Sequence, residues 1–397
     1  MSDTIPKSSG ETGAHERELT QLKTDGLHRR LRDQQDLGAT TMVLDGRRVT
    51  QFASNDYLGL SRHPLVVEAG IDALRKYGNS ATASRLICGN HELYPKLEKR
   101  LADLKGKAAA LVFPTGYMAN LGALSALVGT DDLIVMDKLN HASLYDACRL
   151  SGATVKRYAH NNLEHLEKHL AQAGRYRRRY IVTDGVFSVD GDLAPLPELV
   201  DLARDRDCRL VIDDAHGTGV LGPAGRGTSA HLKTEVPLEI GTLSKGIGAL
   251  GGFVVADRET IEFLINKARP FIFTTGLPPA TLAAAASLLK VMADEPWRQE
   301  RVLKLAKYVR SALEDAGFSV SQGPTPIIPI IIGDEQTTLR MAAACLENNL
   351  FVPAVRHPTV PLNQARLRMT LSAAHSDAEV EMSIEILCRE GRKTGLI

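Results

Sequence analysis

The chain has 397 residues, and its 48 lysine and arginine residues against 47 aspartate and glutamate residues give a formal net charge of +1 at pH 7. Such a balanced composition creates no global field that would favour nucleic acid or an anionic membrane as a partner. No apolar run is long enough to span a bilayer, and the polar segment 1–16 lacks the apolar stretch of a secretory signal. We therefore expect a cytoplasmic protein without nucleic-acid or membrane partners.

The cysteine pattern excludes two kinds of stabilising framework. There are five cysteines, widely separated and with no C-x-x-C pair. A scattered, odd-numbered set of this kind is typical neither of a disulfide-stapled domain nor of a structural zinc site, and we expect no bound metal. The basic run at 175–179 is interpreted as a solvated loop before a strand, in preference to a phosphate- or RNA-binding patch.

The first 60 residues are predicted to form an arm that precedes the main fold. Residues 1–16 are rich in Ser, Thr, Gly and charged residues and are expected to lack regular structure. Leucines at roughly helical spacing predict a helix over 17–35. The Asp45-Gly46 pair predicts a tight hairpin turn, and a strand is expected over 52–60, ending in a polar turn.

From residue 64 the sequence alternates helical segments with short β-branched runs, which predicts an α/β fold with a mostly parallel sheet. Helices are expected at 64–77, 91–105, 116–127, 143–150, 163–171 and 195–205. Strands are expected at 108–113, 133–136, 154–158, 180–184, 209–213, 238–241 and 252–256. In such a sheet ligands bind beyond the carboxyl ends of the strands, so polar residues that directly follow a strand are the first candidates for function.

Beyond residue 278 the pattern changes to a smaller α+β unit. A long Ala- and Leu-rich helix pair is expected at 280–293 and 297–316. It is followed by expected strands at 318–321, 327–332 and 367–371 and by helices at 337–348 and 377–390. We therefore predict three segments: an N-terminal arm at 1–60, a large domain at 61–290 and a small C-terminal domain at 291–397.

Lys245 follows a predicted strand, within the segment GTLSKG at 241–246. A lysine between a strand end and flexible glycines is poorly placed for packing, and lysine forms Schiff bases with carbonyls when a pocket lowers its pKa. Taken alone, a Ser-Lys-Gly loop is more often a solvated turn. The polar residues that follow the other strands decide between the two interpretations.

An acidic residue and a histidine follow the strand at 209–213: Asp213 ends the strand, and His216 lies three residues further on. A metal site is the least expected use of this pair, because no second His or Cys cluster is placed to complete a shell. A hydrolase triad would need an activated Ser or Cys, and the sequence has no Gly-x-Ser-x-Gly elbow. A carboxylate that stabilises the protonated pyridine nitrogen of pyridoxal 5′-phosphate (PLP) combines naturally with a Schiff-base lysine.

Three further strand ends supply groups suited to the same cofactor. Gly116 and Tyr117 begin a helix directly after a strand, where backbone N–H groups and the helix dipole favour a phosphate. His141 follows another strand and offers an imidazole for the cofactor ring, and Ser188 follows a third and can hydrogen-bond a phenolate oxygen. Each feature alone also has a structural explanation, such as a capped helix start. Together they follow the order that a PLP site in this kind of sheet requires.

Several motifs occur in fixed order along the chain: NDYLGL (55–60), GYMAN (116–120), NHAS (140–143), DDAHG (213–217) and TLSK (242–245). From about residue 26 to its C-terminus the chain thereby resembles the α-oxoamine synthase family of fold-type I PLP enzymes. The resemblance implies an aspartate aminotransferase-like fold, PLP as cofactor and a homodimer with active sites at the interface. It also implies the decarboxylative condensation of two small-molecule substrates, an amino acid and an acyl thioester.

The resemblance implies a role for each matching residue. Lys245 would carry the Schiff base to the cofactor, and Asp213 would pair with the pyridine nitrogen; together with His141 and His216 they are the expected catalytic group. The other residues implied to hold the cofactor are Gly116, Tyr117, Ser188 and Thr242, with Thr274 or Thr275 reaching the phosphate of a neighbouring subunit. Those implied to bind substrate are Asn55 and Arg368 for the amino-acid carboxylate, with His141 over the ring, and Arg29, Arg356 and Thr359 on the acyl-donor side.

The choice of substrates stays open in part. Within the family, the segments VFSVDGD (186–192), HGTG (216–219) and RHPTVP (356–361) favour members that join L-alanine to a pimeloyl thioester of CoA or a carrier protein. Glycine-using members remain an alternative, because one methyl group supplies only about 1–3 kcal/mol of discrimination. Further alternatives are an aminotransferase or a β/γ-eliminating lyase on the same fold, and a relative that only binds PLP. Two departures from the family pattern, a less glycine-rich segment at 78–85 and Cys88, lie near the expected acyl-donor entrance.

Overall fold

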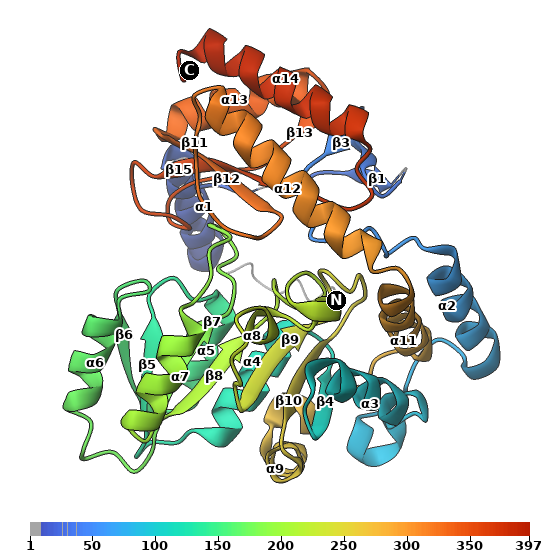
Figure 1. Cartoon of the computed structure of the whole chain (residues 1–397), viewed down its shortest axis with the longest axis vertical. Helices are drawn as coiled ribbons and strands as arrows, with labels where there is room; N and C mark the ends of the chain where they lie inside the picture. Colours follow the sequence, from blue (N-terminus) through green and yellow to red (C-terminus); the bar gives the residue numbers. More distant parts are fainter. Residues whose placement is uncertain (1–8, 26, 30, 37) are drawn as a thin grey trace, which may run out of the picture.

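Seven strands form one mixed sheet in the larger part of the molecule (Figure 1). The computed structural model describes residues 9–25, 27–29, 31–36 and 38–397. The order of the strands across the sheet is β4 (Ala109–Phe113), β10 (Gly252–Ala256), β9 (Leu238–Thr242), β8 (Arg209–Asp213), β7 (Arg179–Asp184), β5 (Leu133–Asp137) and β6 (Thr154–Tyr158). Only β10 pairs antiparallel, with β4 and β9, which confirms the predicted mostly parallel sheet.

Helices cover both faces of this sheet, because side chains along each buried strand alternate between its faces. In β7, Val182 packs with α4 (Gly116–Leu127) and α5 (Ala142–Leu150), while Ile181 packs with α6 (Leu163–Ala171) and α7 (Leu196–Asp205). The remaining helices of this part are α2 (Pro64–Tyr77), α3 (Leu93–Lys105), α8 (Thr228–His231), α9 (Arg258–Lys267), α10 (Arg269–Ile272) and α11 (Pro279–Asp294). The π-helix η1 (Arg85–Gly89) and the 3-10 turn η2 (Pro223–Gly225) complete it.

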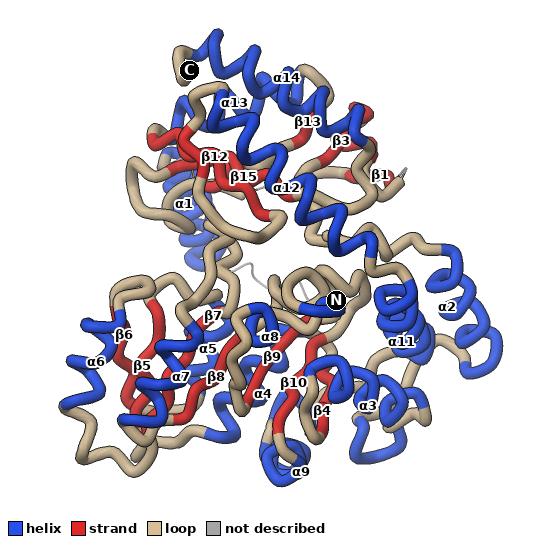
Figure 2. Tube along the Cα trace, in the orientation of Figure 1, coloured by secondary structure: helices blue, strands red, loops and turns tan. Residues whose placement is uncertain are grey.

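The smaller part is built on an antiparallel sheet and lies at the top of Figures 1 and 2. Its strands lie in the order β11 (Ser319–Val320), β12 (Ile327–Gly333), β15 (Ala365–Thr370) and β14 (Ala354–Val355). They are accompanied by α12 (Trp297–Asp315), α13 (Glu335–Glu347) and α14 (Asp377–Thr394). The N-terminal strands β1 (Gln34–Asp36), β2 (Thr41–Leu44) and β3 (Arg47–Gln51) join it by parallel pairing of β3 with β13 (Leu350–Phe351). The division into segments 1–60, 61–290 and 291–397 remains a proposal.

The N-terminal predictions were partly wrong. Helix α1 spans Ser9–Thr24 rather than 17–35, so residues 9–16, which were expected to lack structure, are helical, while residues 1–8 lie outside the described residues. The helix ends early because the N–H groups of Leu27 and His28 both turn back to the carbonyl of Leu22. The hairpin turn at Asp45-Gly46 is confirmed, with both residues at positive φ.

The strand expected over 52–60 was also misplaced, because β3 already ends at Gln51. The side-chain oxygen of Gln51 accepts hydrogen bonds from the backbone N–H groups of Ala53, at 3.0 Å, and Ser54, at 2.8 Å. These bonds turn the backbone away from the extended direction that a strand needs. The segment therefore runs as a loop, which carries polar residues toward the large sheet.

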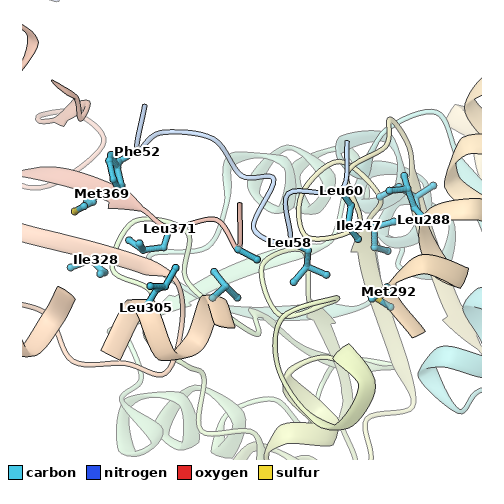
Figure 3. Close-up of a cluster of buried hydrophobic side chains, with 14 of the residues drawn as sticks. Phe52, Leu58, Leu60, Ile247, Leu288, Met292, Leu305, Ile328, Met369 and Leu371 are labelled. Carbon is cyan, nitrogen blue, oxygen red and sulfur yellow. The ribbon is translucent and has the colours of Figure 1, made fainter. Parts of the chain in front are cut away.

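A continuous apolar core joins the two parts of the molecule (Figure 3). Leu58 and Ile247, from the side of the large sheet, belong to the same buried cluster as Leu305, Ile328 and Met369 of the smaller part. Each of these side chains is buried, and burying an aliphatic side chain contributes about 1.5–3 kcal/mol. The loop at 52–63 is thereby held between the two sheets by its own apolar residues.

The basic run at 175–179 has a structural use that its composition did not reveal. The buried carboxylate of Asp132 accepts hydrogen bonds from Arg177, at 3.1 Å, and from Arg178, at 2.8 Å. Burial opposes ionisation of this carboxylate, but the hydrogen bonds from Arg178 and Arg177 outweigh it and lower the pKa of Asp132 to about 2. The two arginines therefore tie the loop before β7 to the start of β5.

We predict that Asp132→Asn costs about 1–2 kcal/mol of unfolding free energy at pH 7, because the partly exposed arginines screen the pair. Since the folded-state pKa of Asp132 is depressed, its stabilisation is present above about pH 4 and is lost as the pH falls toward 2. Urea denaturation should show the difference from wild type at pH 7 and a much smaller one near pH 2.5. The exposed neighbour Asp131→Asn is the control, and a difference independent of pH would contradict the assignment.

Candidate active site

Lys245 begins a chain of hydrogen bonds that runs from the segment after β9 to the loop after β3. Its Nζ lies 2.7 Å from His216 Nε2, and His216 Nδ1 lies 2.7 Å from the hydroxyl of Tyr57. The hydroxyl of Tyr57 donates to Asn55 Oδ1 at 3.2 Å. We assign the ring proton of His216 to Nδ1, because in this tautomer Lys245 can donate to Nε2 while Tyr57 accepts from Nδ1 and donates to Asn55.

Burial favours the neutral forms of Lys245, His216 and Tyr57, the hydrogen-bonded groups described above. Desolvation lowers the pKa of Lys245, against the opposing charges of Asp213 and Asp184. Burial, followed by the charges of Lys245 and Arg368, lowers the pKa of His216 well below its ordinary value of 6.5. Burial also raises the pKa of Tyr57 to about 12. A neutral histidine thus contacts a lysine whose pKa is lowered, a shift toward the unprotonated amine that is the reactive form of that residue.

Asp213 ends β8 as a buried carboxylate with two firm partners. Its Oδ2 accepts from Asn120 Nδ2 at 2.7 Å, and its Oδ1 accepts from the backbone N–H of Ala215 at 3.0 Å. Asn120 Nδ2 also lies 2.7 Å from Ser143 Oγ, which is 2.7 Å from His141 Nδ1. The predicted residues Asp213 and His141 are therefore joined through Asn120 and Ser143.

His141 is fixed at the start of α5, where its Nδ1 accepts from the backbone N–H of Ser143 at 3.2 Å. The backbone N–H of His141 donates to Asp184 Oδ2, at the end of β7, at 2.9 Å. Burial lowers the pKa of His141, so its imidazole is neutral near pH 7. Burial and the neighbouring Asp213 raise the pKa of Asp184 well above its ordinary value.

The start of α4 and the end of β9 form a narrow cradle. Thr115 caps the helix, its Oγ1 accepting from Met118 N at 3.1 Å. A Cβ built on Gly116 would lie 3.1 Å from Thr242 Cβ and 3.2 Å from Thr242 Oγ1, so a larger residue at 116 would crowd this threonine. The N–H groups of Gly116 and Tyr117 precede the helix's own hydrogen bonds, an arrangement that binds anions. The side chain of Tyr117 is exposed and contacts Asp146, so its backbone is the part that serves the cradle.

Arg368 reaches the site from β15 of the smaller part. Its Nε donates to the carbonyl of Ser188 at 2.7 Å, and its Nη2 donates to Asn55 Oδ1 at 3.4 Å. The predicted pair of Arg368 and Asn55 therefore lies together, 313 residues apart in the sequence. Ser188 joins them through its backbone carbonyl, and the predicted use of its hydroxyl stays a prediction.

Several predicted residues lie away from this group in the single chain. Arg29 is exposed between α1 and β1, and Arg356 Nη1 lies 3.8 Å from Glu335 Oε2. Thr359 is exposed, while Thr274 is half-buried and Thr275 is exposed in the segment before α11. Their roles toward an acyl donor or a neighbouring subunit stay predictions.

Three residues with clear contacts were missed as individual site residues: Tyr57, Asn120 and Asp184. Tyr57 and Asn120 stand inside the motifs NDYLGL and GYMAN, and Asp184 ends a predicted strand. Asp213 was selected because it lies at the carboxyl end of a strand, and the same criterion could have selected Asp184. Asn120 lies one turn into its helix, so a search for polar residues at strand ends does not select it.

Within the described ranges, no group of three or more His, Cys, Asp or Glu side chains is arranged to hold a metal ion. No described helix is both long enough and apolar enough to cross a bilayer.

Comparisons with known proteins agree with this arrangement. Residues 47–387 match the family Aminotransferase class I and II. An 8-amino-7-oxononanoate synthase from Geobacter sulfurreducens is 44% identical over 385 residues, which cover 96% of this chain and 98% of that protein. The structure of a serine palmitoyltransferase variant from S. paucimobilis with bound PLP and myriocin superposes with a TM-score of 0.92 at 30% identity, covering 99% of this chain and 100% of that chain. An 8-amino-7-oxononanoate synthase from Francisella tularensis superposes with a TM-score of 0.75 at 28% identity, covering 88% and 99% of the two chains. The chain therefore belongs to the aminotransferase class I and II family, as a fold-type I PLP-dependent α-oxoamine synthase related to the 8-amino-7-oxononanoate synthases.

Proposed function

We propose that the chain is an acyltransferase that condenses L-alanine with a pimeloyl thioester and releases 8-amino-7-oxononanoate, carbon dioxide and the free thiol, a step of biotin biosynthesis. The observation that carries the proposal is a lysine of lowered pKa, Lys245, hydrogen-bonded to the neutral His216 and electrostatically coupled to the buried Asp213. The names of relatives that are 41–48% identical over nearly the whole chain support the choice of substrates.

The donor groups of the site fit PLP. The N–H groups at the start of α4 suit its phosphate, and the lack of a side chain at Gly116 leaves room beside them. Thr242 borders this place; its hydroxyl donates to the carbonyl of Gly251 at 2.8 Å and would have to turn to reach a phosphate. Asp213 suits the protonated pyridine nitrogen, and the imidazole of His141 suits the face of the ring. Bound there, PLP supplies an aldehyde that captures the substrate's amino group and a ring that withdraws electrons from its Cα.

Lys245 is the group that moves the proton of the amino-acid Cα. Its lowered pKa favours the neutral amine, and in that form a hydrogen bond donated by Lys245 Nζ to His216 Nε2 leaves the nitrogen lone pair free to accept that proton. The same nitrogen can return the proton to the product. Tyr57 holds His216 in the tautomer that this bond requires, because its own proton is directed to Asn55.

Arg368 and Asn55 are suited to orient the amino-acid carboxylate. The carbonyl of Ser188 fixes the guanidinium through Nε, and a guanidinium binds a carboxylate through its remaining donors. Because Asn55 Oδ1 already accepts from Tyr57 and Arg368, its Nδ2 is the group available to donate to the substrate. Both side chains therefore present donors rather than acceptors to an anionic substrate.

A homodimer is part of this proposal. Leu86 and Ile87 on η1 are 51% and 79% exposed, and Phe273, at the end of α10, is 71% exposed. These apolar side chains lie on adjoining segments, because Ser84 and Thr275 form a backbone bridge. An exposed apolar surface of this kind often marks an interface, and Thr274 and Thr275, the residues proposed to reach a neighbouring subunit, lie in the same segment as Phe273.

We also propose that the protein is located in the cytoplasm. All five cysteines lie in the described ranges and are free thiols, which suits a reducing compartment.

Purified protein supplied with PLP, L-alanine and pimeloyl-CoA is expected to release free thiol and carbon dioxide in equal amounts. Thiol release is measured with a chromogenic thiol reagent, and carbon dioxide with carboxyl-labelled alanine. Pyruvate without thiol would instead identify an aminotransferase. Faster turnover with glycine than with L-alanine would identify a glycine-using member of the family.

A further inference from the structure

A pocket of about 350 Å³ lies beside the proposed catalytic group, lined from both parts of the molecule. The large sheet contributes Lys138 after β5, His160 after β6 and the loop after β7, and the smaller part contributes Arg366 of β15. The pocket shares two loops with the site, because Lys138 lies three residues before His141 and the lining residues Phe187 and Val189 flank Ser188. Its volume is at the lower end of the roughly 300–1,000 Å³ that is typical of small-molecule sites.

The lining combines an apolar wall with several ionisable side chains. The apolar side chains of the lining are Leu139, Phe187, Val189, Ile331, Val360 and Pro361. The ionisable side chains are Lys138, His160, Arg366 and Asp190. Burial opposes the charge of His160, but hydrogen bonds and charges from Asp137 and Asp192 outweigh it and raise the pKa of His160 to about 9, so His160 is a cation at neutral pH.

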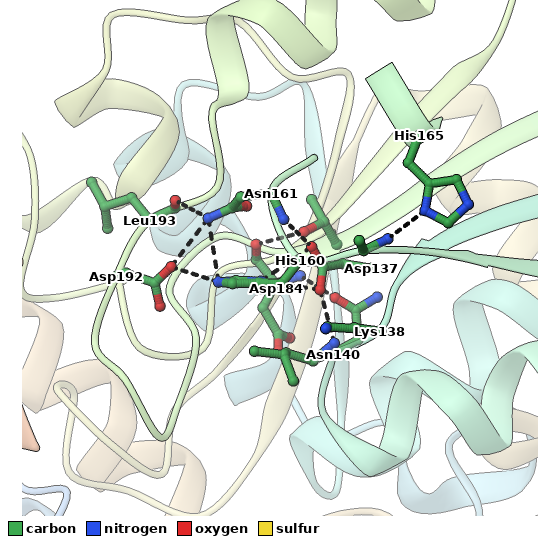
Figure 4. A network of polar contacts seen from close by, with 12 residues as sticks. Asp137, Lys138, Asn140, His160, Asn161, His165, Asp184, Asp192 and Leu193 are labelled. Carbon is green, nitrogen blue, oxygen red and sulfur yellow. Dashed lines mark hydrogen bonds and ion pairs between the residues drawn. The ribbon is translucent and has the colours of Figure 1, made fainter. Parts of the chain in front are cut away.

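Two of these cations are already engaged. His160 Nδ1 lies 3.1 Å from Asp137 Oδ1, and its Nε2 lies 2.8 Å from Asp192 Oδ2 (Figure 4). Arg366 contacts the carboxylate of Asp190. The ammonium of Lys138, in contrast, is exposed and has no hydrogen bond or ion pair with any residue that the structure describes. Lys138 is therefore the cation that is available to a ligand.

We propose that this pocket receives the far end of the acyl donor, and that Lys138 pairs with a carboxylate at the end of an aliphatic chain. This inference rests on the proposed function and specifies its substrate as an acyl thioester with a free terminal carboxylate. The apolar wall contacts the methylene groups, and the ammonium forms a charge-assisted hydrogen bond with the terminal carboxylate. A chain that ends in a methyl group would leave the ammonium without this partner.

The test compares pimeloyl-CoA with heptanoyl-CoA, which has the same chain length and no terminal charge. In the Lys138→Met variant, the KM for pimeloyl-CoA is expected to rise about tenfold, because one exposed charge-assisted hydrogen bond is lost. The KM for heptanoyl-CoA and the kcat with either donor should change less than about twofold. Lys138→Arg should restore most of the preference for pimeloyl-CoA. Lys156→Met, on the neighbouring strand β6, is the control, because its side chain is half-buried and does not line the pocket.

Each other result has a definite meaning. An equal loss with both donors would overturn the proposal, since the ammonium would then serve the CoA moiety or the loop itself. Kinetics identical to wild type would overturn it as well, while leaving the proposed function intact. If the wild-type protein released thiol from neither donor, the proposed function would fail first and this inference would fail with it. Equal melting temperatures of the variants and wild type exclude unfolding as the cause of any loss.

Discussion

Replacing Lys245 with alanine is expected to reduce thiol release from pimeloyl-CoA and L-alanine by at least about 10⁴-fold. The change removes the covalent anchor of the cofactor and the base for the Cα proton together, and general acid–base catalysis alone contributes about 10²–10⁴-fold. The surrounding hydrogen bonds of His216 with Tyr57 do not depend on the lysine, so the variant should fold. Initial rates at saturating PLP measure the effect, and the visible absorbance of the bound cofactor should change with it.

The matched control is Lys307→Ala on α12, whose side chain is exposed. It should retain the activity and the absorbance of the wild-type protein. Near wild-type turnover by Lys245→Ala would refute the proposed mechanism, because the lysine would then be neither anchor nor base.

The Lys105→Met variant is expected to lose about 3–5 kcal/mol of unfolding free energy, the usual cost of breaking a buried ion pair. Lys105 Nζ is fully buried and lies 2.6 Å from Asp214 Oδ2 and 2.7 Å from Glu239 Oε2. Burial opposes the charge, but the two carboxylates outweigh it and raise the pKa of Lys105. Methionine keeps the shape and removes the charge, which leaves two buried carboxylates without their cation. Urea denaturation at pH 7 measures the loss.

Lys99→Met on the same helix, α3, provides the comparison. Lys99 pairs with Asp103 at 2.8 Å, but their side chains are 75% and 64% exposed, so the change should cost less than about 0.5 kcal/mol. Adding Asp214→Asn and Glu239→Gln to Lys105→Met should recover part of the loss, since no buried charge then remains unpaired. Equal denaturation midpoints for Lys105→Met and Lys99→Met would contradict a stabilising role of the buried cluster.

Much of the large sheet could be predicted because local signals agree there. The helix at 116–127 follows an apolar strand and has Thr115 as its cap, and both of its ends were predicted as they lie in the structure. The same holds for the strands at 154–158 and 252–256. Position at a strand end also selected Asp213, which the structure places beside Asn120.

What the sequence could not reveal depends on contacts between distant segments. Tyr57 and His216 are 159 residues apart, and nothing near either residue specifies that they meet. Short strands such as β13 are defined by their pairing partner rather than by their own composition. The early end of α1 and the turn at Gln51 also rest on backbone and side-chain bonds that residue spacing does not encode.

The measurement that tests the central claim most directly is to locate the lysine that binds the cofactor. The protein is incubated with PLP and reduced with borohydride, and its peptides are analysed by mass spectrometry. We predict one modified peptide, carrying a phosphopyridoxyl group on Lys245. The Lys245→Ala variant, treated in the same way, should give no modified peptide. A stable modification of another lysine at equal yield, or no modification of Lys245, would contradict the account.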